Sequence, residues 1–188
     1  NNYPEYMVGT RAFHHAARAI AYAAKGDPGN ARKEQTIFLE KSKLVPKEEV
    51  FSNNSEESLL AVAGRMVEGE ILVRENKLDA GIAELREAIT LEDALNYDEP
   101  PGWLIPVRHS LGATLMQNGR YAEAEKVYRE DLARLPENGW SLYGLASSLK
   151  AQRKNASEAA VTHEKFRKLW AKADTKITSS CLCQPSRM

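Results

Sequence analysis

The chain has 188 residues, 43% of them apolar and 28% charged, which is the balance of an ordinary soluble protein with enough residues for a substantial core. Lysine plus arginine and aspartate plus glutamate number 26 each, so the net charge is zero with neutral histidines. That balance gives no bulk attraction to nucleic acids or anionic membranes, and it favours self-association. No apolar run approaches the roughly 20 residues of a membrane span, and among compartments the cytoplasm is favoured.

Residues 1–44 are predicted to form a first pair of helices joined by a turn. Gly26-Asp27-Pro28-Gly29 is that turn, because Gly26 can take the left-handed conformation that ends a helix and Pro28 suits the start of the next. The first helix is rich in alanine and lacks the polar outer face that the end of a repeat array needs. We therefore expect it to pack on two sides, as an internal element of a longer protein.

Two insertions accompany the second predicted pair, one before its first helix and one after its second helix. Residues 45–55 form a polar linker, and Ser55 at its end suits a helix N-cap. The pair spans residues 56–103 and includes an acidic, proline-containing insertion from Glu92 to Pro101. This insertion could fold over a binding groove or form a weak oxygen-ligand cation site. It could also be a longer connection in which Asp98 or Glu99 pairs with Arg108 and Trp103 packs on the helices.

The clearest helical pair is predicted over residues 104–137. Its small, apolar and turn-forming positions are Leu111, Gly112, Leu115, Gly119, Tyr121, Ala124, Tyr128 and Pro136. Gly112 and Ala124 suit a close crossing of two antiparallel helices, where only a small side chain fits. The pattern returns 34 residues later in a last pair over residues 138–173. Residues 174–188 are expected to form a polar, disordered tail.

This spacing resembles the 34-residue tetratricopeptide repeat. Equivalent positions upstream are Ala19, Tyr22, Gly26, Ala31 and Phe38 in the first pair and Gly69, Leu72, Leu78, Gly81, Leu85 and Ala88 in the second. The resemblance implies an all-α fold, a right-handed α-solenoid of about four antiparallel helix-turn-helix pairs with about eight helices. Residues 97–103 and 138–142 also resemble the C-terminal arrays of large, mostly uncharacterised bacterial tetratricopeptide proteins, which brings no established activity.

The family places its ligand contacts on the first helix of each pair, which lines a concave groove. Carried over, these positions are Phe13, Met66, Glu70, Arg74, His109, Met116, Gln117, Trp140, Tyr143 and Lys150. Their flat aromatic surface and mixed charges suit a peptide or a partner helix, although the large apolar members could instead pack between repeats. Ala16 and Ile20 stand where the family's carboxylate clamp needs Lys and Asn, so acidic chaperone tails are not expected ligands.

Cys181 and Cys183 are the only cysteines in the sequence. As thiolates they could hold a soft metal or half of a zinc site, or they could be reduced thiols or form an interchain disulfide. The four histidines lack the three- or four-residue spacing of a helical zinc pair. The sequence contains no nucleophile elbow, phosphate-binding loop or dinucleotide fingerprint, so we predict neither an enzymatic activity nor a cofactor.

The sequence therefore predicts a protein-interaction module or assembly scaffold that binds a protein or peptide segment in a concave groove. Trp140 and Tyr143 are its expected apolar anchors, and the chain could self-associate or belong to a larger assembly. One alternative is a metal or redox accessory protein that uses Cys181 and Cys183. Another is the C-terminal regulatory part of a larger enzyme.

Overall fold

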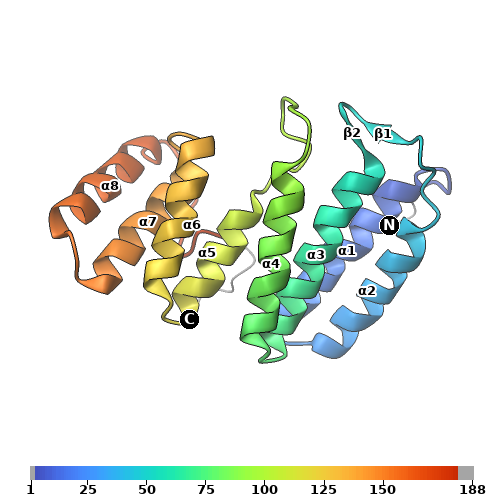
Figure 1. Ribbon diagram of the computed structural model, residues 1–188, viewed down its shortest axis with the longest axis horizontal. Helices are drawn as coiled ribbons and strands as arrows, with labels where there is room; N and C mark the ends of the chain where they lie inside the picture. Colours follow the sequence, from blue (N-terminus) through green and yellow to red (C-terminus); the bar gives the residue numbers. More distant parts are fainter. Residues whose placement is uncertain (1–2, 182–188) are drawn as a thin grey trace. The chain divides into compact units, whose positions relative to one another are not determined.

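A computed structural model describes residues 3–181 as an almost wholly helical chain (Figure 1). In this part of the chain the elements are α1 (Val8–Ala24), α2 (Pro28–Ser42), β1 (Val50–Phe51), β2 (Asn54–Ser55), α3 (Glu56–Arg74), α4 (Leu78–Asp93), α5 (Val107–Gln117), α6 (Tyr121–Arg134), α7 (Gly139–Gln152) and α8 (Ala156–Leu169). The predicted all-α class with eight helices is thereby confirmed for the described residues. Contacts divide the chain into two compact units, unit 1 (residues 1–107) and unit 2 (residues 108–188).

Unit 1 contains two helical pairs and a short β-hairpin. Helix α1 packs against α2 and α3 against α4, and α3 also packs on α1 and α2. The predicted turn is confirmed, because Gly26 takes a left-handed φ of 77° after α1 and Pro28 opens α2. Asp27 caps α2, and Ser55 caps α3 as the sequence predicted, each by accepting a hydrogen bond from a backbone amide of the first turn.

The core of unit 1 lies between α1, α2 and α3. Phe38 from α2 is 1% exposed and packs with Val67 and Ile71 from α3. Helix α1 contributes a stripe of small residues, Ala12, Ala16, Ala19 and Ala23. On the opposite side of α1, Ala17 and Ala21 are exposed. Within the described residues α1 therefore packs on one side, and not on two sides as its composition suggested.

Helices α3 and α4 cross where both lack a side chain. A Cβ atom on Gly69 would lie 3.0 Å from the carbonyl oxygen of Gly81, and one on Gly81 would lie 2.8 Å from the carbonyl oxygen of Gly69. Leu85 and Val73 fill the space beside these glycines. Backbone meets backbone at this crossing, so a larger residue at either position would push the two helices apart.

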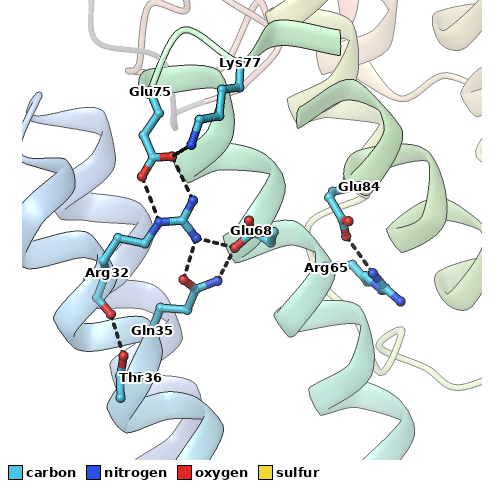
Figure 2. A network of polar contacts seen from close by, with 8 residues as sticks. All are labelled: Arg32, Gln35, Thr36, Arg65, Glu68, Glu75, Lys77 and Glu84. Atoms are coloured by element: carbon cyan, nitrogen blue, oxygen red, sulfur yellow. Dashed lines mark hydrogen bonds and ion pairs between the residues drawn. The ribbon is translucent and has the colours of Figure 1, made fainter. Parts of the chain in front are cut away.

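An arginine ties α2 to α3. The Arg32 guanidinium donates from Nε and Nη2 to the two carboxylate oxygens of Glu75, at 2.8 and 2.9 Å, and from Nη1 to Glu68 and Gln35 (Figure 2). Gln35 in turn donates to Glu68 at 2.6 Å. Hydrogen bonds from Arg32 and then Lys77 hold the pKa of Glu75 at about 2, so the pair with Arg32 stays ionised at neutral pH.

Unit 2 is organised around the ring of Tyr128. Helix α6 packs on α7, and α7 packs on α8. The Tyr128 side chain in α6 is 1% exposed and lies against Gly112 of α5 and Gly144 of α7. A Cβ atom on either glycine would overlap the ring. The sequence predicted Gly112 for a close helix crossing with Ala124, whereas the structure uses Gly112 and Gly144 as space for an aromatic side chain.

Residues 174–181 have no regular secondary structure, yet they end in the interior of unit 2, which differs from the disordered tail that we expected. The Ser180 hydroxyl, 2% exposed, donates to the carbonyl oxygen of His109 at 3.0 Å and accepts from the Tyr128 hydroxyl at 2.7 Å. Burial raises the pKa of Tyr128, so its hydroxyl stays protonated and can act as this donor. The remainder of the expected tail, residues 182–188, lies outside the described residues.

Replacing Gly144 with alanine should destabilise unit 2, because the added methyl group would overlap the buried Tyr128 ring. We expect a loss of about 1–3 kcal/mol in the free energy of unfolding, as for other overpacked cores. Urea unfolding followed by circular dichroism measures it. Gly29→Ala is the matched control, since a Cβ atom there meets only Asp27, at 3.7 Å. An equal loss of stability in both variants would contradict this packing.

Candidate functional site

The two insertions that interrupt the helical pairs meet each other in unit 1. The first contains the hairpin of β1 and β2, in which Val50 pairs with Ser55 in antiparallel register and which leads directly into α3. The second is the loop of residues 94–106 that follows α4. Because α3 and α4 run antiparallel, the start of α3 and the end of α4 lie at the same end of the pair, and so do the hairpin and the loop (Figure 1).

Asparagine side chains join the hairpin to the loop. The backbone N–H of Asn96 donates to Oδ1 of Asn54 at 2.8 Å, and Nδ2 of Asn54 donates back to the carbonyl oxygen of Asn96 at 3.1 Å. Nδ2 of Asn96 donates to the carbonyl oxygen of Asn53 at 2.7 Å, and Nδ2 of Asn53 donates to that of Tyr97 at 3.0 Å. Asn54 is 3% exposed, so water competes little for its hydrogen bonds.

Asp98 completes this connection. Its carboxylate accepts hydrogen bonds from the Ser52 hydroxyl at 2.7 Å, from the backbone N–H of Asn53 at 3.2 Å, and from Nδ2 of Asn53 and Asn54 at 3.2 and 3.4 Å. The bond from Ser52, with those from the two asparagines, holds the pKa of Asp98 below its ordinary value, although burial acts in the opposite direction. Ser52, Asn53, Asn54, Asn96 and Asp98 form what we call the Asp98 clamp.

The backbone on both sides of the clamp is shaped for these contacts. Ser52 takes a left-handed φ of 55°, which closes the two-residue turn of the hairpin. In the loop, a Cβ atom on Gly102 would lie 3.1 Å from Nδ2 of Asn54, so the glycine allows the loop to pass close to the hairpin. Trp103 then packs on the core of unit 1, with its ring centroid 6.4 Å from that of Phe13. The loop is thus fixed to the unit at both the clamp and the tryptophan.

The joined segments expose large apolar side chains. Val50, Phe51, Tyr97, Leu104 and Ile105 are each between 57% and 78% exposed. Glu48, Glu49 and Glu99 are exposed neighbours of these residues in the sequence. We call these eight residues the insertion surface. Apolar side chains of this size on ordered segments are a usual feature of protein interfaces.

The two insertions also contain more acidic than basic residues. Residues 45–55 and 94–106 together contain four carboxylates, Glu48, Glu49, Asp98 and Glu99, and one basic residue, Lys47. Unit 1 as a whole has 18 acidic and 12 basic residues, whereas unit 2 has 8 acidic and 14 basic ones. The zero net charge of the chain therefore conceals a separation of charge between its two units. A partner of the insertion surface would be complementary if it were basic and apolar.

Unit 1 holds four of the predicted groove residues, and two of them are buried. Met66 is 6% and Glu70 is 1% exposed, and Glu70 lies 4.0 Å from Nη2 of Arg74 one helical turn later. Phe13 is half-buried against Trp103. Of these four, Met66 and Glu70 contribute to the packing of α3 and offer almost no surface to a partner.

The predicted anchors Trp140 and Tyr143 lie in unit 2 and pack α7 against α8. The Trp140 ring meets the edge of Trp170 at a centroid distance of 5.6 Å, and the Tyr143 ring meets Phe166 at 5.4 Å. Phe166 and Trp170 stack on each other at 5.5 Å. Trp140 and Tyr143 are half-buried in this aromatic cluster. Part of the apolar surface of these two side chains is therefore buried between α7 and α8 and is not available to a partner.

His109 is buried in a polar network. It is 4% exposed, and its Nε2 lies 3.3 Å from Oδ2 of Asp131 and 3.0 Å from Nδ2 of Asn138. The Ser141 hydroxyl donates to the same Asp131 oxygen at 2.6 Å. His109 therefore links α5, α6 and α7 within unit 2. Of the other predicted groove residues in unit 2, Met116 is half-buried and Gln117 and Lys150 are exposed.

Cys181, one of the two predicted thiolate ligands, is disulfide-bonded and 6% exposed, with its Sγ 3.3 Å from the Ser110 hydroxyl. A disulfide sulfur is not a thiolate, so metal binding there would first need reduction. Cys183 lies outside the described residues. Among residues 3–181, no three His, Cys, Asp or Glu side chains are grouped so that they could hold a metal ion. The metal hypothesis stays a prediction from the sequence.

Comparisons with protein-family models, with curated proteins and with solved structures found no match to this chain. The tetratricopeptide resemblance therefore stays a prediction from residue spacing, and no activity or partner can be transferred from a relative. In the described residues, none of the helices is long and apolar enough to span a membrane.

Sequence reasoning missed the residues of the clamp. The sequence predicts a polar linker over residues 45–55, although Val50 and Phe51 within it are apolar. It gives no sign that the two insertions meet, because the contacts between them join residues 42 to 46 positions apart. The available signal was the Asn53-Asn54 pair and Asn96 next to Asp98, since such side chains often bond to loop backbone.

Replacing Asp98 with asparagine should loosen both insertions. One carboxylate oxygen would become an NH2 group facing the N–H donors of Asn53 and Asn54, so acceptor sites would be lost and donors would oppose each other. Amide hydrogen exchange of residues 50–55 and 94–98 should become at least about tenfold faster. Glu99→Gln, with the same charge change one position later, should leave exchange unchanged. Equal acceleration in both variants would contradict the role of the clamp.

Proposed function

We propose that this chain is a non-enzymatic helical module that binds a protein segment, and that the insertion surface is its contact site. The observation that carries this proposal is the exposure of Val50, Phe51 and Tyr97 on segments that the Asp98 clamp holds in place. Exposed apolar side chains on a loose loop lose conformational entropy when they bind. A surface that is already ordered avoids most of that cost.

The chemistry of the surface favours one kind of partner. Phe51 and Tyr97 offer aromatic area, which often provides the anchors of an interface. Glu48, Glu49 and Glu99, which are exposed close by in the sequence, add negative charge, and Lys47 is the one basic residue in the two insertions. Charges at the rim select the partner and accelerate association more than they add affinity. The partner segment is therefore one that combines lysine or arginine with aliphatic or aromatic residues.

The insertion surface is better supported as a contact site than the groove that the sequence predicted. Met66, Glu70 and His109 from that groove are each more than nine-tenths buried, and Trp140 and Tyr143 pack in part on α8. A buried side chain cannot bind a partner without opening the helical pair. The groove therefore stays a prediction from family resemblance.

Selection of peptides from a random phage-displayed library on the immobilised chain tests the proposal. We expect enrichment of sequences that combine basic with apolar residues. The double variant Phe51→Ser, Tyr97→Ser should recover the enriched phage at least about tenfold less well, because it removes the aromatic anchors without touching the core. Circular dichroism of this variant should match that of the wild type.

A matched control distinguishes binding at this surface from nonspecific binding to exposed apolar side chains. Tyr6→Ser, Leu44→Ser also removes two exposed apolar side chains from unit 1, with exposures of 82% and 68%. This control should recover the enriched phage as well as the wild type does. The proposal would be rejected if no peptide were enriched over the bare support, or if the surface variant and the control behaved alike.

A further inference from the structure

Helix α8 in unit 2 carries a second exposed face that is both apolar and basic. Val161 and Leu169 are 58% and 47% exposed, and Lys165 and Lys168 between them are also exposed. Spacings of four, three and one residues along a helix place these four side chains on one side. The two acidic residues of α8 are both ion-paired, Glu158 with Arg129 at 2.8 Å and Glu164 with Arg167 at 3.3 Å. We call Val161, Lys165, Lys168 and Leu169 the α8 face.

The α8 face has the chemistry that the insertion surface lacks. The insertion surface is acidic and apolar, with Glu48, Glu49 and Glu99 beside Phe51 and Tyr97. The α8 face is basic and apolar, and it belongs to the unit in which basic residues outnumber acidic ones. Each copy of the chain therefore carries both halves of a complementary pair of surfaces. Because the net charge of the chain is zero, two copies also experience no overall electrostatic repulsion.

We propose that the insertion surface of one copy binds the α8 face of a second copy, an inference that rests on the function proposed above. The two surfaces differ, so the contact is heterologous. In a bound pair, one copy keeps a free α8 face and the other keeps a free insertion surface. Association of this type continues from copy to copy unless the geometry closes a ring. The contact combines exposed apolar area with exposed charges, so added salt weakens it through screening.

Sedimentation velocity of the 188-residue chain over a concentration series tests the proposal. In low salt the weight-average mass should rise from 21.0 kDa beyond that of a dimer as concentration increases. At about 0.5 M NaCl the association should weaken at least tenfold, because the Debye length falls to a few ångströms. A chain that stays at 21.0 kDa at every concentration in low salt would overturn the proposal.

Charge reversal tests which surfaces meet. The insertion variant Glu48→Lys, Glu49→Lys, Glu99→Lys has two basic surfaces, and the α8 variant Lys165→Glu, Lys168→Glu has two acidic ones. Each should be monomeric alone, since both of its surfaces carry the same charge. An equimolar mixture of the two should associate again, because each surface then finds an opposite one. No other pair of surfaces predicts this rescue.

A control variant changes the charge of unit 2 equally at positions outside α8. Lys126→Glu, Lys154→Glu replaces two exposed lysines there, and it should associate as the wild type does. Loss of association in this control, or a mixture that stays monomeric, would overturn the proposal. If the chain is monomeric but still selects basic, apolar peptides, self-association fails while the proposed function stands with another partner. If it selects no peptide either, both fail.

Discussion

Close contact between neighbouring helices in this chain depends on glycines, which have no side chain, at the points of contact. In unit 1, Gly69 and Gly81 bring the backbones of α3 and α4 into direct contact. In unit 2, Gly112 and Gly144 leave room for the buried ring of Tyr128, whose hydroxyl then fixes Ser180. These contacts leave no space for an extra methyl group, so the distance between neighbouring helices is set by residue type. Polar bonds such as those of Arg32 (Figure 2) then fix the orientation of helices already in contact.

The two insertions differ from the helical pairs in the side chains that they expose. The helical pairs bury most of their large apolar residues. The insertions instead expose Phe51 and Tyr97, while hydrogen bonds to Asp98 hold their backbone in place. An ordered, acidic and apolar surface contributes little to folding, since its apolar area stays in water. We infer that it is retained for binding. Its chemistry is matched by the α8 face, and this match is the physical basis for proposing that copies of the chain bind one another.

The helical pairs could be predicted from the sequence because their signals are local. The turn at Gly26 and Pro28 and the cap at Ser55 depend on the conformation of one or two residues, and the structure contains them. Burial of Met66 and His109 could not be predicted, because helical spacing alone does not say which face meets a neighbour. The contacts of the Asp98 clamp also could not be predicted from the sequence. Its partners lie more than 40 residues away and are brought together only by the antiparallel packing of α3 and α4.

We propose that this chain binds a basic, apolar segment at the insertion surface. A decisive test is to record amide NMR spectra of the isotope-labelled chain during titration with a synthetic peptide of residues 156–172. We expect chemical shifts to change mainly in residues 48–57 and 94–105, and the changes to reach saturation. Shifts centred instead on Trp140, Tyr143 and Lys150, or no shifts at millimolar peptide, would contradict it.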